Sequence, residues 1–269
     1  MIKLSTMTSV CPDWEISKII DKMQEYGYTG LEPRVDWGHA AGIEFDMPSK
    51  ARDELRLRVE DAGLTISCVA TGARFASPDA AETEKCLEEA RNGILLAADL
   101  GCPYLRTFGG ERGDGEVYFM VKRAAENYQK ILDLAEEKGV TILMETHDSW
   151  CVSSQVRAVV LEVDHPNLKV LWDLMHPQRF MEKPEETMVT VGSLTRHLHA
   201  HDGVYGDQGE IEPAPLGEGV FDHATPLKLL NDAGFDGYFS VEVIHKPGSE
   251  HDADGVLSQY ARVFKGMIE

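Results

Sequence analysis

The stretch that decides the fold is R-H-L-H-A-H-D-G, Arg196–Gly203, in which histidine occupies every second position as His197, His199 and His201. Small or apolar residues stand between the histidines. Because alternate residues of a β-strand point to one face, a strand here aims three imidazoles at the same side. The pattern predicts a strand whose histidine face looks into a polar site.

Three apolar runs elsewhere in the chain each end in a carboxylate. They are Val140–Glu145, Leu168–Asp173 and Tyr238–Glu242. Near-continuous apolar runs of this length are typical of strands that are buried on both faces of a parallel sheet. Parallel strands end at the same edge, so we expect the three carboxylates to meet close to the histidine strand.

The whole chain shows the same alternation of strand and helix. Eight predicted strands run over Ile2–Met7, Thr29–Glu32, Leu64–Ala70, Pro103–Phe108, Val140–Glu145, Leu168–Asp173, Leu194–His201 and Gly237–Val243. The helical patterns between and after them cover Pro12–Tyr26, Pro48–Ala62, Ala80–Leu100, Glu116–Lys138, Ser153–Glu162, Pro184–Thr190, Asp222–Ala233 and His251–Ile268. Residues 202–220 are expected to form a long loop.

Eight strand–helix units in 269 residues are about 34 residues each, close to the length of a βαβ step. The predicted fold is therefore a (β/α)8 TIM barrel, with residues 1–269 as a single domain. A doubly wound open sheet is the main alternative. It is less favoured because the first strand–helix turn lacks the G-x-G-x-x-G phosphate loop.

In a barrel the active site lies at the carboxyl ends of the strands. Glu145, Asp173, His199 and Glu242 fall near the ends of strands five to eight. Three converging carboxylates repel one another unless a cation lies among them. The set predicts one divalent metal ion per chain, with Mn²⁺ favoured and Mg²⁺, Co²⁺ or Zn²⁺ as alternatives. Surface salt bridges or helix caps are the competing interpretation.

The amino-acid composition limits the classes of molecule that the protein is expected to bind. The chain has 46 acidic and 26 basic side chains and a net charge of −20, which disfavours binding to nucleic acid or to an anionic membrane. No apolar run has the length of a membrane span, and no signal peptide is recognisable. The five cysteines are scattered, as in a reducing compartment, so a cytoplasmic location is expected.

Four short motifs resemble the xylose-isomerase-like superfamily of sugar and sugar-phosphate isomerases and epimerases. They are D-L-M-H at Asp173–His176, H-L-H at His197–His199, L-G-E-G at Leu216–Gly219 and V-E-V at Val241–Val243. The nearest pattern is that of the D-tagatose/D-psicose 3-epimerase branch. The resemblance covers the chain and is strongest after residue 144.

The resemblance implies roles for particular side chains. Glu145, Asp173, His199 and Glu242 would be the metal ligands, and His176 would contact substrate hydroxyls. Members of the superfamily often form dimers or tetramers, so a homodimer or homotetramer is an expectation. An arginine of the epimerase branch is replaced here by a tyrosine, six residues after the metal-binding histidine.

The chemistry also follows from the residues. The metal would polarise a substrate carbonyl and acidify the adjacent C–H. Glu145 and Glu242 are the predicted acid–base pair, one removing a proton to give a cis-enediolate and the other returning one. Return to the opposite face gives epimerisation, and return to the neighbouring carbon gives isomerisation. The expected substrate is a small ketose, sugar phosphate or keto-polyol.

Five further residues are candidate substrate contacts. His147 follows strand five and His201 ends strand seven. Glu32 ends strand two, where it could reach a substrate hydroxyl. Arg106 and Arg34 could hold a phosphate or a carboxylate because a guanidinium matches such groups. A salt bridge within the barrel is the alternative for each arginine.

Two other reactions compete with isomerisation. A metal-dependent dehydratase or lyase, acting on a related polyol or keto-inositol, would expel a hydroxyl from the same enediolate, and no motif excludes it. A phosphoesterase like the trizinc abasic-site endonuclease of the superfamily needs further histidines after strands two and three. Residues 31–36 and 68–71 contain none, which disfavours that reaction. A non-catalytic sugar-binding role would require the four metal ligands to be vestigial, and the presence of all four argues against it.

Overall fold

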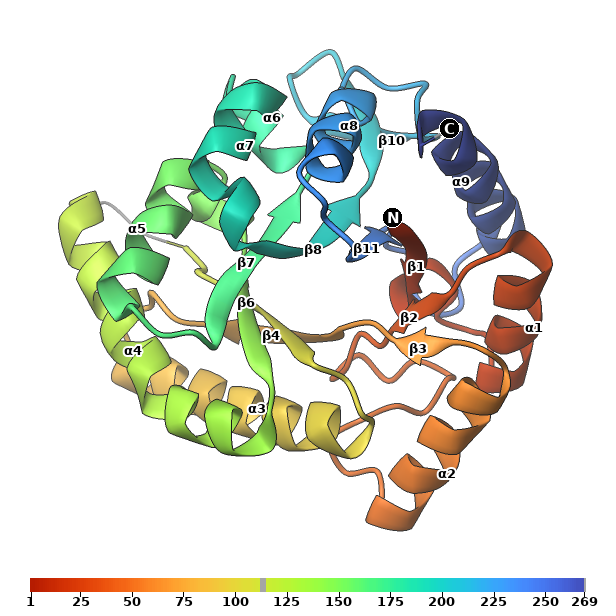
Figure 1. Ribbon diagram of the computed structural model, residues 1–269, viewed down its shortest axis with the longest axis horizontal. Helices are drawn as coiled ribbons and strands as arrows, with labels where there is room; N and C mark the ends of the chain where they lie inside the picture. The colour runs from red at the N-terminus through yellow and green to blue at the C-terminus, as the bar shows by residue number, and fades with distance from the viewer. Residues whose placement is uncertain (112–114, 269) are drawn as a thin grey trace.

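The computed structural model describes residues 1–111 and 115–268. Its parallel strands form a nearly closed barrel that is surrounded by helices (Figure 1). The barrel strands are β1 (Lys3–Met7), β2 (Gly30–Glu32), β3 (Thr65–Ile66), β4 (Val69–Arg74), β5 (Tyr104–Phe108), β6 (Thr141–Glu145), β7 (Leu168–Asp173), β8 (Thr195–Ala200) and β11 (Tyr238–Val241). They lie in the order β3-β2-β1-β11-β8-β7-β6-β5-β4. The predicted TIM barrel is confirmed.

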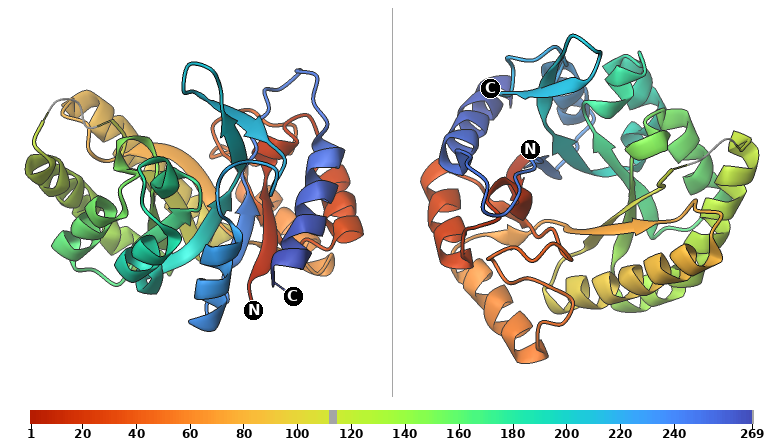
Figure 2. Two further views of the ribbon diagram at one scale, coloured as in Figure 1. Left: turned by 90° about the horizontal axis from the view of Figure 1, so that it is seen from above. Right: turned by 180° about the vertical axis from the view of Figure 1, so that it is seen from behind.

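The helices cover the outside of the barrel, as both views in Figure 2 show. They are α1 (Ile16–Tyr26), α2 (Ser49–Asp61), α3 (Ala80–Asp99), α4 (Val117–Lys138), α5 (Ser153–Val163), α6 (His176–Arg179), α7 (Pro184–Val191), α8 (Ala224–Asp232) and α9 (Ala253–Ile268). Among the residues described, none of these helices combines the length and the apolar character that a membrane crossing needs.

Local sequence explains where several helices begin and end. Asp79 precedes α3 and accepts hydrogen bonds from two backbone N–H groups of its first turn, which satisfies donors that a helix start leaves free. Gly27 and Gly139 end α1 and α4 in the left-handed conformation, with φ of 81° and 69°. Glycine adopts this conformation without the steric cost that a side chain adds.

The third barrel strand differs from its prediction. It is divided at Ser67 and Cys68: β3 pairs with β2, whereas β4 pairs with β5 and continues to Arg74. Ser67 stays bound to the second strand through its N–H, 2.8 Å from the carbonyl of Leu31. An isolated bridge between Arg34 and Ala70 then closes the ring.

The predicted alternation in β8 is confirmed. His197 and His199 point into the barrel, where both contact a buried carboxylate. Leu198 and Ala200 belong to the hydrophobic core that includes the surrounding helices. The register aligns Asp173 with His199, so adjacent strands bring these two side chains to the same level.

The predicted loop over residues 202–220 is partly wrong. Its first half forms an antiparallel hairpin of β9 (Asp202–Tyr205) and β10 (Ile211–Ala214), which projects beyond the barrel strands (Figure 2). Asp202 accepts hydrogen bonds from the N–H groups of Gly217 and Gly219. This carboxylate therefore ties the second half of the segment back to the hairpin.

Candidate active site

Four side chains from neighbouring strands converge at one end of the barrel. Glu145 and Asp173 end β6 and β7, His199 lies in β8, and Glu242 directly follows β11. The first three are fully buried and Glu242 is 6% exposed. One donor atom from each lies within 4.8 Å of all the others. We call these four residues the carboxylate–histidine cluster.

The imidazole of His199 lies at the centre of this cluster. Its Nδ1 is 2.9 Å from Glu145 Oε1 and 3.1 Å from Glu242 Oε2. Asp173 is fixed by the backbone N–H groups of Met175 and His176, which both donate to its Oδ1. The structure thus brings together all four residues that the sequence proposes as metal ligands.

The cluster fits a divalent cation. Its donors are three carboxylates and one imidazole, a set that suits Mn²⁺, Mg²⁺, Co²⁺ or Zn²⁺. Within the described part of the chain, Oε2 of Glu145 is buried and has no hydrogen-bond partner. It lies 3.3 Å from Nε of Arg106, an ion pair without a hydrogen bond, and a bound cation would give this oxygen a further partner.

Electrostatics in the cluster reflect the crowding of charge. Burial lowers the pKa of His199, but the carboxylates of Glu242, Glu32 and Glu145 outweigh this effect and raise that pKa well above its usual value. Burial raises the pKa of Glu242, whereas the charges of His199 and Arg106 bring it down to about 2. Glu242 therefore stays ionised and attracts positive charge.

Arg106 lies against the cluster. Its Nε is 3.3 Å from Glu145 Oε2 and its Nη2 is 3.9 Å from Glu242 Oε1. Nη1 donates to the carbonyl of Thr71 at 2.7 Å. Of the two sequence interpretations, a barrel salt bridge describes this position, because the guanidinium is engaged with carboxylates of the protein.

Glu32, which the sequence suggests as a contact to a substrate hydroxyl, lies against two histidines of the barrel. Its carboxylate is fully buried and contacts Nε2 of His197 at 2.8 Å and Nε2 of His199 at 2.9 Å. With both oxygens engaged by histidines, Glu32 holds His199 in place, and this role fits its position better than a substrate contact does.

Arg34 forms contacts where the two ends of the barrel sheet meet. Its Nη1 donates to the carbonyls of Val35 and Ala70, at 2.7 and 3.1 Å. Its backbone also forms the bridge to Ala70. Among the described residues, Arg34 is not one of those that line the cavity at the cluster, so this placement gives no support to a role in anion binding.

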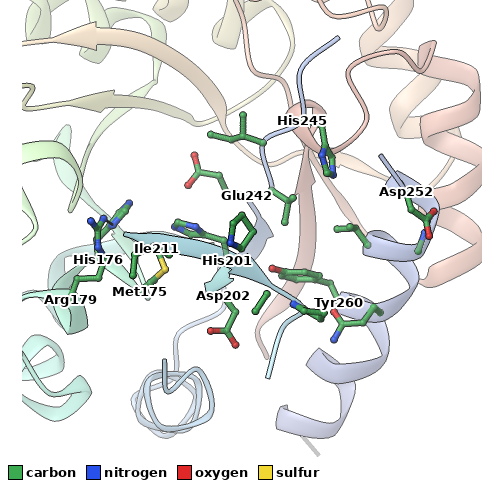
Figure 3. A pocket seen from close by; sticks show the side chains of 18 of the residues that line it. Met175, His176, Arg179, His201, Asp202, Ile211, Glu242, His245, Asp252 and Tyr260 are labelled. Carbon is green, nitrogen blue, oxygen red and sulfur yellow. Dashed lines mark hydrogen bonds between the residues drawn. The ribbon is translucent and has the colours of Figure 1, made fainter. Parts of the chain in front are cut away.

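A cavity of about 770 Å³ opens beside the cluster. Figure 3 shows Glu242 and His201 near its middle, with Tyr260 of α9 towards one side. The predicted contacts His147, His176 and His201 all line it. The cavity is large enough for a small sugar or polyol.

The three cavity histidines have different electrostatic environments. Burial, together with the neighbouring histidines, lowers the pKa of His176 to about 3. Burial also lowers the pKa of His147, but the hydrogen bond with Asp148 and the cluster carboxylates outweigh it and raise the value to about 9. The contact of His201 Nε2 with Asp173 Oδ2, at 3.0 Å, raises the pKa of His201 despite its burial.

Sequence reasoning missed two parts of the site. One is Arg179, which lines the cavity from α6; its position three residues after His176 was the available signal. The other is an apolar wall contributed by the hairpin and α9, through Ile211, Pro213, Ala214 and Val256. Nothing in the sequence linked this wall to the cluster, since the segment was predicted to be a loop.

Comparison with known proteins agrees with this architecture. The chain matches the family described as "Xylose isomerase-like TIM barrel" over residues 20–264. It is 25% identical over 242 residues to the 3-dehydroshikimate dehydratase of Bacillus anthracis, which covers 83% of this chain and 84% of that protein.

Solved structures show the same fold. The IOLI protein with a binding zinc atom has a TM-score of 0.84 at 17% identity, covering 99% of this chain and 98% of that one. A D-psicose 3-epimerase in the presence of D-fructose has a TM-score of 0.78 at 16% identity, covering 99% of each chain. The chain belongs to the xylose isomerase-like TIM barrel family, as its sequence predicted.

Proposed function

We propose that this protein is a divalent-metal-dependent isomerase or epimerase of a ketose, sugar phosphate or keto-polyol, and that it works through a cis-enediolate. The observation that carries the proposal is the placement of Glu145 and Glu242. Both carboxylates contact the same nitrogen of His199, and Glu242 also lines the cavity. Two carboxylates this close to each other could exchange protons with neighbouring carbons, or with opposite faces of one carbon, of a bound substrate.

The residues of this chain have separable tasks in the reaction. Glu145, Asp173, His199 and Glu242 would hold the metal, which would polarise the substrate carbonyl and acidify the adjacent C–H. One of the two glutamates removes that proton, and the electron pair of the C–H bond moves into the enediolate. The other glutamate returns a proton and restores the carbonyl.

The cavity histidines orient the substrate in this scheme. His176 is neutral, because its pKa is lowered to about 3, so it can donate one hydrogen bond to a substrate oxygen. His147 lies across from it, with the two rings 4.4 Å apart. The charge of Arg106 lowers the pKa of Glu242, which keeps this carboxylate ionised and able to accept a proton.

A dehydratase is the second candidate, and the similarity to a 3-dehydroshikimate dehydratase favours it. The first step is the same removal of a proton beside a carbonyl. The enediolate then expels a hydroxyl from the next carbon as water, with the proton supplied by a carboxylic acid or imidazolium of the site. The two candidates differ only in the fate of the enediolate.

Other properties stay predictions. Mn²⁺ is our first choice of metal, and the zinc in the IOLI structure makes Zn²⁺ the next to test. The strongly acidic composition, with a net charge of −20, supports a small-molecule substrate over nucleic acid. A cytoplasmic location and a homodimer or homotetramer are expected.

Deuterium from solvent water tests the proposal. The metal-loaded protein is incubated in heavy water with D-psicose, L-ribulose and 3-dehydroshikimate, and the products are analysed by mass spectrometry. Incorporation of deuterium without loss of water supports an isomerase or epimerase, whereas a dehydrated product supports the second candidate.

Chelation and the variant Glu242→Gln should each abolish turnover. The variant Glu60→Gln, on the exposed face of α2, should keep it. Full turnover after chelation would contradict the proposal.

A further inference from the structure

Arg179 is a permanent cation on the wall of the cavity. Among the described residues that line the cavity, it is the one arginine or lysine. The structure records no carboxylate of the described chain within 4.0 Å of its guanidinium, although acidic side chains outnumber basic ones by 46 to 26. Figure 3 shows it beside His176, on the side of the cavity opposite Tyr260.

The contact between Arg179 and His176 sets the position of the proton on the imidazole. Nη1 of Arg179 lies 3.1 Å from Nδ1 of His176. A guanidinium can only donate, so Nδ1 accepts and the proton of the neutral ring is on Nε2. This Nε2 is buried and has no hydrogen-bond partner among the described residues, and His176 itself is 5% exposed. The histidine therefore offers a fixed, unused donor at the cavity.

The rest of the Arg179 guanidinium is also unused. An arginine carries five N–H donors, and within the described part of the chain one of them is used, in the hydrogen bond to His176. The remaining donors form a planar fork that matches a carboxylate in a bidentate arrangement. Arg179 is an exposed residue, and its hydrogen bond to His176, whose backbone N–H is bound to Asp173, links its guanidinium to the cluster.

The surroundings of Arg179 favour a carboxylate over a phosphate. A phosphate dianion is generally met by several cations or by a row of backbone N–H groups. Here one arginine lines the cavity, and Glu242, Asp202 and Asp252 contribute negative charge. His147 and His201 also line it, but each is already paired with a carboxylate of the protein, Asp148 and Asp173. A single negative charge matches a single guanidinium. We propose that the substrate carries a carboxylate, and that Arg179 is the residue that selects it.

This inference rests on the proposed function and narrows its substrate class to keto-polyol carboxylates. Three probes that share an α-hydroxy ketone and differ at one carbon can test it: D-fructose, D-fructuronate and D-fructose 6-phosphate. Calorimetry gives the Kd of each for the metal-loaded wild type and for the variants Arg179→Met, Arg179→Lys and Arg58→Met. Arg58 is exposed on α2 and serves as the matched control.

We expect wild type and Arg58→Met to bind D-fructuronate about ten-fold or more tightly than D-fructose. In Arg179→Met this ratio should fall to about one, and Arg179→Lys should retain part of it. The ratio is the readout, so a general weakening of binding by the variant does not affect it. Thermal melting confirms that each variant is folded.

Three outcomes would overturn the inference. A fructuronate preference that survives in Arg179→Met would place the anion site elsewhere. A preference for D-fructose 6-phosphate that depends on Arg179 would replace the carboxylate with a phosphate. Failure of all three probes to bind would contradict the proposed function itself, since the α-hydroxy ketone is common to them.

Discussion

Glu32 accepts a hydrogen bond from Nε2 of His199 across 2.9 Å, deep in the barrel. This contact leaves Nδ1 of His199 directed at Glu145 and Glu242. A carboxylate behind a metal-binding histidine fixes the tautomer and orientation of the ring and raises its basicity. Glu32 is therefore expected to act on a bound metal through His199, and its second oxygen holds His197 in the same way.

Glu32→Gln should weaken the binding of a divalent metal by about 10- to 100-fold. The amide has one acceptor oxygen, so it cannot serve both histidines. Metal affinity is measured by competition with a chelator of known affinity, and circular dichroism checks the fold. Glu60→Gln on the exposed face of α2 is the control. An unchanged metal affinity in a folded Glu32→Gln protein would show that His199 needs no such partner.

Arg106 gives the second prediction. Its guanidinium lies within 4 Å of both Glu145 and Glu242, and all three side chains are at most 6% exposed. Arg106→Met removes the cation and leaves two buried carboxylates facing each other. We expect the metal-free protein to lose about 3–5 kcal/mol of unfolding free energy.

A bound divalent cation supplies positive charge at the same carboxylates. The loss in Arg106→Met should therefore be smaller when urea unfolding is measured with saturating metal than without it. Arg58→Met should unfold like wild type in both conditions. Equal destabilisation of Arg106→Met with and without metal would show that the arginine acts by packing alone.

The sequence predicted the parts of this protein that depend on periodicity. Alternation in β8 separates His197 and His199 from the core residues between them, and this pattern is visible in the sequence alone. Apolar runs ending in Glu145 and Asp173 mark β6 and β7 equally well, because a strand buried on both faces needs apolar residues at nearly every position. Register between parallel strands then brings their ends together.

The parts that the sequence does not reveal depend on contacts between distant segments. Whether Glu32 faces a substrate or His199 is decided by the height of β2 relative to β8. The break at Ser67 arises because the third strand must pair with neighbours on both sides as the barrel closes. The hairpin after β8 has two four-residue strands with polar residues, and Pro213 lies within β10. Such strands carry little of the alternation that marks a buried sheet. Arg179 belongs to the site only because α6 follows β7 directly.

His39 gives a prediction about stability and pH. Burial and the charge of Arg34 lower the pKa of His39 from 6.5 to about 4 in the folded protein. Between these values the unfolded chain binds a proton that the folded protein does not, so stability rises with pH. The contribution of His39 is complete above pH 6.5 and is lost progressively as the pH falls towards 4.

His39→Gln should therefore reduce the loss of stability between pH 7 and pH 5, measured as the difference in urea midpoints. Glutamine keeps a polar group near Thr8, whose hydroxyl lies 2.9 Å from Nδ1 of His39. His165→Gln is the control, because this histidine is partly exposed in the turn before β7. A pH dependence identical to that of wild type would mean that His39 titrates normally in the folded protein.

Gly109 shows how packing beside the cavity constrains a single backbone position. It follows β5, and a Cβ built on it would overlap the indole of Trp150. Trp150 is fully buried and its Nε1 donates to the carbonyl of Gly110 at 2.9 Å. Gly109→Ala must displace this ring, so we expect it to destabilise the protein by about 1–3 kcal/mol in urea unfolding. Gly266→Ala in α9 is the matched control, since nothing lies within 4 Å of its added Cβ, and there alanine should be neutral or stabilising by up to about 1 kcal/mol.

Trp150 is only three residues beyond His147, whose backbone carbonyl accepts a hydrogen bond from the N–H of Trp150, so displacement of the indole should also weaken substrate binding. If Gly109→Ala were as stable as Gly266→Ala, the indole would not be packed against this glycine, and the support of His147 would have to come from Asp148 alone.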